Sequence, residues 1–114
     1  MLSEDTYWAK VFLGLRVGYS RKHYSYRSAE NTIKRYVSDH PLCVSMTRTQ
    51  FAYKGGWDRG IIIELINYPR FPIPFGSIRE YATDLAQFLM LRYGQNRISI
   101  MMPDVTIMLE VERC

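Results

Sequence analysis

The chain contains little cysteine and no long hydrophobic run. Its two cysteines, Cys43 and Cys114, lie far apart among 114 residues, which argues against a disulfide framework. The longest uninterrupted apolar run, at residues 88–91, is far shorter than the roughly 20 residues that a membrane-spanning helix needs. The first residues also lack the basic and apolar regions of a signal peptide. We therefore expect a cytoplasmic protein that does not enter a membrane.

Recognisable catalytic and metal-binding motifs are absent as well. The sequence has no G-x-S-x-G, no glycine-rich phosphate loop and no H-E-x-x-H. His40 and Cys43 are three residues apart, but no second pair of ligands has metal-like spacing. Because His40 is expected to close a helix and Cys43 to open a strand, we interpret both as structural. The sequence thus predicts a non-enzyme with no catalytic residue, no metal and no cofactor.

Alternating apolar patterns dominate the chain. Apolar residues at every second position predict a strand, and apolar residues at helical spacing predict a helix. The first helix is expected to begin after Ser25 or Ser28 and to end near Asp39, before Pro41. A capping box at Ser77 predicts the start of a second helix, and Gly94 its end. The predicted strands are residues 10–19, 42–53, 61–67, 98–102 and 105–109.

This order predicts an α+β fold of the ferredoxin-like, split βαβ type (β-α-β-β-α-β) with a C-terminal β-hairpin extension. Residues 1–9 are expected to form an N-terminal lead-in, and residues 10–114 a single domain. The strand at residues 61–67 is apolar on both faces, although two helices can cover only one face of such a sheet. We therefore expect a second subunit on the other face, in a homo-oligomer that is a dimer or a trimer.

Positive charge is concentrated between Arg16 and Arg35, in a chain of net charge +4. The predicted loop at residues 19–27 mixes tyrosines, whose rings can stack on bases, with cations that can bind phosphate. This composition predicts a site for a small anionic, nucleotide-like ligand, and the alternative interpretation is a solvated loop. The candidate ligand-binding residues are Arg16, Tyr19, Arg21, Lys22, Tyr24, Tyr26, Arg27, Lys34 and Arg35.

Two aromatic segments are candidate interfaces. Trp57 and Arg59 lie in a glycine-rich stretch predicted to be a turn, and both residue types are enriched at the centres of interfaces. The connector at residues 67–76 carries three prolines together with Phe71 and Phe75, which would form an apolar patch if exposed. We expect these four residues to contact a second copy of the chain or a host protein. The alternative for Trp57 is a ring folded back on its own strand.

The layout resembles the CutA and PII-type groups of small ferredoxin-like proteins. The similarity lies in the opening strand, the long second strand followed by the sequence YKGGW (residues 53–57), the isoleucine-rich third strand and the final helix and strand. The chain is also similar to a family of small bacterial and phage proteins with a Gly-Gln step after the last helix, here Gly94-Gln95. The first resemblance implies a trimer with small ligands in clefts between subunits. It does not imply which ligand, because counterparts of the ligand-binding residues are missing.

These observations lead to three functional hypotheses. The first is a non-enzymatic, oligomeric binding protein, phage-encoded, that binds or sequesters a small anionic ligand or a host protein. The alternative is a nucleic-acid-binding protein that uses the basic-aromatic loop and the first helix. A small enzyme of unrecognised type is the third. Salt separates the first two, since binding to a phosphate backbone weakens steeply as salt rises.

Overall fold

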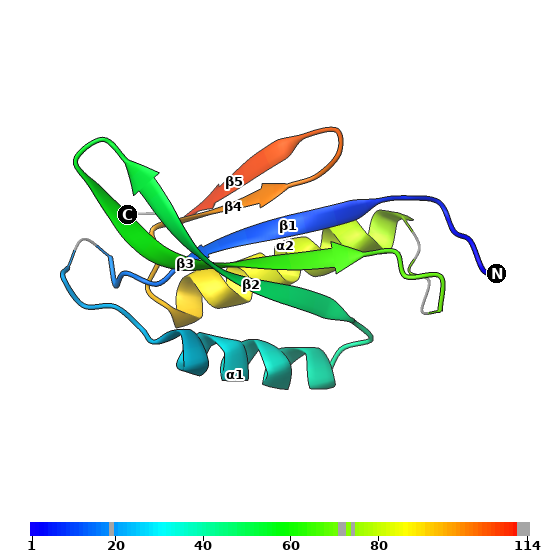
Figure 1. Ribbon diagram of the computed structural model, residues 1–114, viewed down its shortest axis with the longest axis horizontal. Coiled ribbons are helices and arrows are strands. Elements are labelled where there is room, and N and C mark those ends of the chain that lie inside the picture. The colour runs from blue at the N-terminus through cyan, green and yellow to red at the C-terminus, as the bar shows by residue number, and fades with distance from the viewer. Residues whose placement is uncertain (19, 71–72, 74, 112–114) are drawn as a thin grey trace.

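The computed structural model describes residues 1–18, 20–70, 73 and 75–111, and it contains a five-stranded antiparallel sheet and two helices. The strands follow the order β2-β3-β1-β4-β5 across the sheet (Figure 1). The predicted α+β class is therefore confirmed. The elements in chain order are β1 (Trp8–Gly14), α1 (Tyr26–Ser38), β2 (Val44–Tyr53), β3 (Gly56–Ile66), α2 (Phe75–Arg92), β4 (Arg97–Met101) and β5 (Thr106–Glu110).

Both helices lie on the same side of the sheet, so the molecule has two layers (Figure 1). Residues at every second position of β1 and of the second half of β3, where Ile61, Ile63 and Leu65 lie, point to this side and are fully buried, as the period of a strand requires. Within the described part of the chain, no helix is long and apolar enough to cross a membrane. The largest buried side chains between the layers include Val11, Leu13, Leu15, Ile33, Ile61, Ile63, Leu65, Leu85, Leu89 and Tyr93.

The helix boundaries follow the sequence signals closely at three of the four ends. The Ser25 side chain caps α1 by accepting a hydrogen bond from the Ser28 amide at 3.1 Å. Gly94 follows α2 with a positive φ of 59°, a conformation that glycine adopts without steric cost. The start of α2 differs from the prediction, since the helix begins at Phe75 and Ser77 is already inside its first turn.

Two connections that the sequence predicted as long loops, one after β1 and one between β2 and β3, are shorter than expected. β2 and β3 are joined by the two-residue turn Lys54-Gly55, because Gly55 adopts a positive φ of 95°. Trp57 and Arg59 therefore lie within β3 and not in a turn. β1 ends at Gly14, but Arg16 pairs with His23 in an isolated β-bridge. The region expected to be an open loop is thus a tight hairpin.

An ion pair fixes the start of α1 against β2. Arg48 donates two hydrogen bonds to the Glu30 carboxylate, at 2.8 and 3.1 Å. This bonding lowers the pKa of Glu30 and raises that of Arg48. The Arg48 guanidinium also lies over the Tyr26 ring, at 5.0 Å from its centroid, and the Tyr26 hydroxyl donates to the Thr49 carbonyl at 2.9 Å. Tyr26 is therefore a structural residue of this contact.

The side of the sheet away from the helices, here called the open face, carries the alternate residues of each strand. Phe12 of β1 lies opposite Ile62 of β3 and Ser99 of β4, while Gly14 pairs with Gly60. None of the described elements covers this face. The expectation that both faces of β3 are covered is therefore met on one side only within a single chain.

Replacing Gly60 by alanine is expected to destabilise the fold. The new Cβ would lie 2.1 Å from a ring carbon of Phe51 and 2.8 Å from the Leu13 carbonyl oxygen, and the latter is backbone that cannot move freely. Overpacking of this kind costs about 1–3 kcal/mol. Gly56→Ala is the control, because its Cβ meets only the exposed Tyr53 ring, at 3.3 Å. Urea denaturation measures both variants, and equal free energies of unfolding would contradict this account of Gly60.

Candidate functional site

A hollow of about 240 Å³ opens on the open face of the sheet. Its apolar walls include Phe12 of β1 and Phe51 of β2, whose rings meet edge to face with centroids 6.3 Å apart. Gly14 contributes only backbone, which leaves room for the side chain of Gln95 above it. The complete lining is Phe12, Gly14, Phe51, Asp58, Gln95, Arg97, Ile98 and Ser99.

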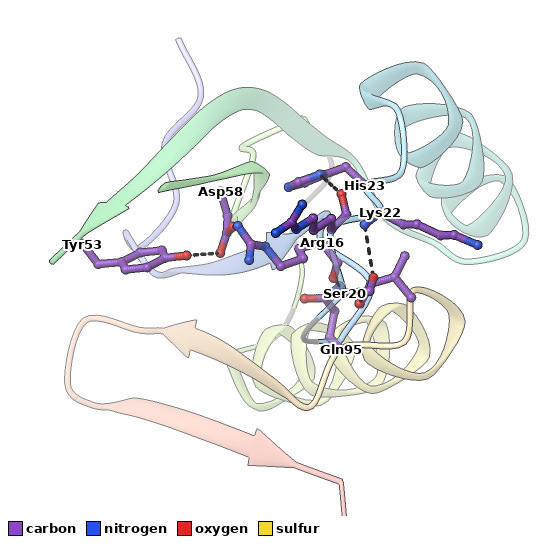
Figure 2. Close-up of polar contacts among 9 residues, drawn as sticks. Arg16, Ser20, Lys22, His23, Tyr53, Asp58 and Gln95 are labelled. Carbon is purple, nitrogen blue, oxygen red and sulfur yellow. Dashed lines mark hydrogen bonds and ion pairs between the residues drawn. The ribbon is translucent and has the colours of Figure 1, made fainter. Parts of the chain in front are cut away.

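A half-buried ion pair stands beside this hollow. Arg16 Nη2 lies 2.6 Å from Asp58 Oδ1, and the two side chains are 33% and 24% exposed. The Tyr53 hydroxyl donates to the other carboxylate oxygen at 3.2 Å, so that Asp58 lies between a phenol and a guanidinium (Figure 2). Arg16 Nε is buried and has no acceptor among the described residues, and the short contact at Oδ1 does not have hydrogen-bond geometry. The pair is thus close, but not all of its polar atoms are hydrogen-bonded within the described residues.

The hairpin at residues 15–24 brings Arg16 to this position. Its ladder consists of the bridge between Arg16 and His23 and of backbone hydrogen bonds on either side. Two contacts attach it to the segment after α2: the Gly18 amide donates to the Gly94 carbonyl at 3.2 Å, and Gln95 Nε2 donates to the Arg16 carbonyl at 2.6 Å. Figure 2 shows Arg16 and Gln95 together with Lys22 and His23 in this region. The segment that follows α2 therefore helps to position Arg16.

The candidate ligand-binding residues do not form one site. Among the described residues of that set, Arg16 alone stands beside the hollow, through its contact with Asp58. Arg21 and Lys22 are exposed at the turn of the hairpin. Three others, Arg27, Lys34 and Arg35, are exposed on α1, on the opposite side of the sheet. Tyr19 lies outside the described residues.

The two described tyrosines of the set both make contacts within the fold. Tyr24 packs edge to face on the buried Tyr93, with ring centroids 4.6 Å apart. Tyr93 in turn donates to the Thr32 hydroxyl at 2.7 Å, which links α2 to α1. Tyr26 is held between Arg48 and the Thr49 carbonyl, as described above. Both rings are partly buried and contribute to the packing around α1.

The candidate interface residues are only partly described. Trp57 is 51% exposed and Arg59 is exposed, both on β3. Phe71 lies outside the described residues, and so does the side chain of Phe75, whose backbone begins α2. The location of Trp57 inside a strand follows from the short turn at Gly55, and its exposed ring remains available to a partner.

A second hollow, of about 290 Å³, lies between α1 and α2 and has a different character. The Tyr36 ring stacks on His40 at 3.9 Å between centroids, and burial raises the pKa of Tyr36. His40 Nδ1 lies 2.6 Å from the Tyr36 carbonyl oxygen, so this histidine closes α1 as a structural group. Among the described residues no cluster of three histidine, cysteine or carboxylate side chains could hold a metal.

Several residues of the open-face hollow are absent from the sequence-based set, notably Phe51, Asp58 and Gln95. The sequence predicted a turn around Asp58, so its place on a sheet face was not foreseen. Gln95 was noted only as part of a Gly-Gln step. One signal did exist. The alternation in the first strand places Phe12, Gly14 and Arg16 on the same face, and an open glycine on that face indicates room for a ligand.

Comparison with known proteins finds similarity in structure alone. No protein-family model and no curated protein matches the sequence. Among solved structures, the chain is similar to a phage SAM lyase in its apo state, with a TM-score of 0.80 over 95% of this chain and 91% of that one. It is also similar to a phage SAM lyase in complex with S-methyl-5′-thioadenosine, with a TM-score of 0.71 over 97% and 94%. Both are 13% identical in sequence. The likeness is one of fold.

This comparison corrects the expectation of a non-enzymatic protein. The fold neighbours are enzymes, which contradicts the hypothesis of a binding or sequestering protein and its nucleic-acid-binding alternative. The expectation of a non-enzyme rested on the absence of local catalytic motifs. The residues of the open-face hollow come from four strands and a turn, and such a site leaves no short motif in the sequence. A small nucleoside is bound by the second neighbour, and this nucleoside is uncharged, unlike the anion that the basic loop suggested.

The structural role of Tyr24 leads to a prediction. Tyr24→Ala removes a ring that packs on Tyr93 and is expected to cost about 2 kcal/mol, less than the roughly 3–5 kcal/mol for a fully buried aromatic side chain, because Tyr24 is only partly buried. The control is the double replacement of Arg21 and Lys22 by alanine, since both are exposed. Thermal unfolding should show a large decrease in melting temperature for the first variant and a change of a few degrees for the second. The reverse order would show that the cations hold the hairpin.

Proposed function

We propose that this chain is a lyase that cleaves S-adenosylmethionine (SAM) and releases S-methyl-5′-thioadenosine at the open-face hollow. The main support is the coincidence of two observations. The fold resembles phage SAM lyases along almost the whole chain, and one of those structures holds S-methyl-5′-thioadenosine. On the same fold, this chain has a half-buried cation and anion beside an aromatic hollow.

The Arg16–Asp58 pair suits the methionyl end of SAM. That end carries an ammonium and a carboxylate, and a guanidinium beside a carboxylate offers the complementary charges. Arg97 also lines the hollow, but its side chain is 63% exposed and pairs with Glu110 at 3.3 Å. We therefore assign the carboxylate to Arg16 and the ammonium to Asp58. The rings of Phe12 and Phe51 provide faces for the sulfonium, since aromatic rings attract cations.

The chemistry of a lyase explains why the site needs no obvious base. Cleavage breaks the bond between sulfur and the γ-carbon of the methionyl group, and the electron pair leaves with sulfur as the neutral thioether. If the substrate's own carboxylate forms the new bond to that carbon, the second product is homoserine lactone, and neither water nor a protein proton enters. We assign this route to the chain, because orientation of a reacting group can supply most of the acceleration. The Arg16–Asp58 pair would provide that orientation.

The hollow in one chain is smaller than the roughly 300–1,000 Å³ that is usual for a small-molecule site. Apolar side chains also remain accessible on the open face, among them Met108, which is 54% exposed. We propose that the chain forms a homo-oligomer, a dimer or a trimer, in which a second open face closes the hollow. Trp57 and Arg59 alternate with Asp58 along β3 and so point to its other side, where they stay candidate contacts with a partner, as do Phe71 and Phe75. The resemblance to the trimeric CutA and PII-type groups agrees with this proposal.

Two finer assignments accompany the proposal. The order β2-β3-β1-β4, with β5 added at one edge, supports a ferredoxin-like description of the first four strands. An enzyme acting on SAM, which is an intracellular metabolite, would work in the cytoplasm.

Incubation of the purified protein with SAM tests the activity. Mass spectrometry should detect S-methyl-5′-thioadenosine and homoserine lactone in equal amounts.

Arg16→Met and Asp58→Asn should each lower the rate of SAM cleavage at least about tenfold, because each leaves one charge of the substrate unpaired. Arg35→Met, on the far side of the sheet, is the matched control and should retain activity. Failure of the wild-type protein to release the thioether would contradict the proposed function, and vinylglycine as the second product would contradict the route.

Sedimentation velocity tests the assembly. The wild-type protein should sediment as a dimer or trimer of its 13.5 kDa chain. Ile62→Glu places a charge in the middle of the open face and should yield a folded monomer. Leu91→Glu is the control, since Leu91 is 63% exposed on α2, on the other side of the molecule. A wild-type protein that sediments as a monomer at micromolar concentration would exclude the proposed assembly.

A further inference from the structure

The side chain of Gln95 has a fixed orientation at the wall of the open-face hollow. It follows Gly94, whose positive φ turns the chain at the end of α2. Its Nε2 donates to the Arg16 carbonyl at 2.6 Å and to the Tyr93 carbonyl at 3.0 Å. An amide nitrogen has two hydrogens, and only the nitrogen can donate to two carbonyls. Both hydrogens are therefore used inside the protein, and the flip of the amide is determined.

The oxygen of the same amide remains available to a ligand. Gln95 Oε1 lies 2.9 Å from the position that a Cβ at Gly14 would occupy, and Gly14 also lines the hollow. Within the described part of the chain, no group donates a hydrogen bond to this oxygen. The hollow thus presents a rigid acceptor that is held in place by two hydrogen bonds. A ligand must bring a donor to this point or leave the acceptor unsatisfied.

We infer that Gln95 determines the purine specificity of the site by accepting a hydrogen bond from the 6-amino group of adenine. This inference rests on the proposed function, since it assigns an adenosyl ligand to the hollow. A 6-oxo purine carries an acceptor at the same place, so two oxygens would face each other. The site should therefore discriminate between adenosine and inosine derivatives that are otherwise identical.

Isothermal titration calorimetry with two nucleosides tests the inference on the wild-type protein. S-Methyl-5′-thioadenosine should bind about 10- to 100-fold more tightly than 5′-methylthioinosine, the range for one unsatisfied buried group. The 3′-deoxy form of S-methyl-5′-thioadenosine should bind within a few-fold of the parent compound. Equal affinity for the adenosine and inosine forms would overturn the inference. If the 3′-deoxy form then also binds much more weakly than the parent compound, Oε1 binds the ribose instead.

Gln95→Met keeps the length of the side chain and removes its acceptor. In this variant the ratio of the two affinities should fall to near one, whatever the change in overall affinity. Gln87→Met, exposed on α2, is the matched control and should keep the wild-type ratio. A Gln95→Met protein that still prefers the adenosine form tenfold would overturn the inference, and if that variant does not fold, the wild-type ratio decides.

The outcomes separate this inference from the proposed function. If S-methyl-5′-thioadenosine binds and SAM is cleaved but the inosine form binds equally well, the function stands and the role of Gln95 is wrong. If the thioadenosine does not bind and SAM is not cleaved, both are wrong.

Discussion

The one-sided packing of the helices against the sheet is the constraint on which the rest of the structure depends. Alternation in β1 and β3 buries one set of residues beneath α1 and α2 and leaves the other set on the open face. In an antiparallel sheet such a face can remain in water if it is polar. Here it carries Phe12, Phe51 and Ile62 beside an ion pair, a composition that indicates a binding surface. The proposed site and the proposed assembly both use this face.

The segment after α2 connects the core to that surface. Tyr93 is fully buried and bonds to α1, whereas Gln95, two residues later, bonds to the hairpin that carries Arg16. A turn at Gly94 allows this change of side. The same few residues thus anchor the helices, fix the hairpin and supply a wall of the hollow. This arrangement lets a small chain position a polar site without a separate supporting domain.

The sequence predicted the elements well, because apolar periodicity reflects burial and burial determines the core. Ser25 and Gly94 marked helix ends correctly, since Ser25 supplies a side-chain acceptor for a free amide and Gly94 adopts a positive φ. Prediction failed where a short turn replaced an expected loop, as at Gly55. The candidate site was predicted less well. Residues that are close in sequence have different surroundings: Tyr24 packs on Tyr93, whereas Lys22 is exposed. Asp58 and Gln95 reach the hollow only because distant strands pair in the sheet.

A crystal structure of the protein with S-methyl-5′-thioadenosine tests the central claim most directly. The account predicts the nucleoside in the open-face hollow, with its purine beside Gln95 and its thioether toward the Arg16–Asp58 pair. A nucleoside bound instead between α1 and α2, beside Tyr36 and His40, would contradict the claim that the open face is the functional site.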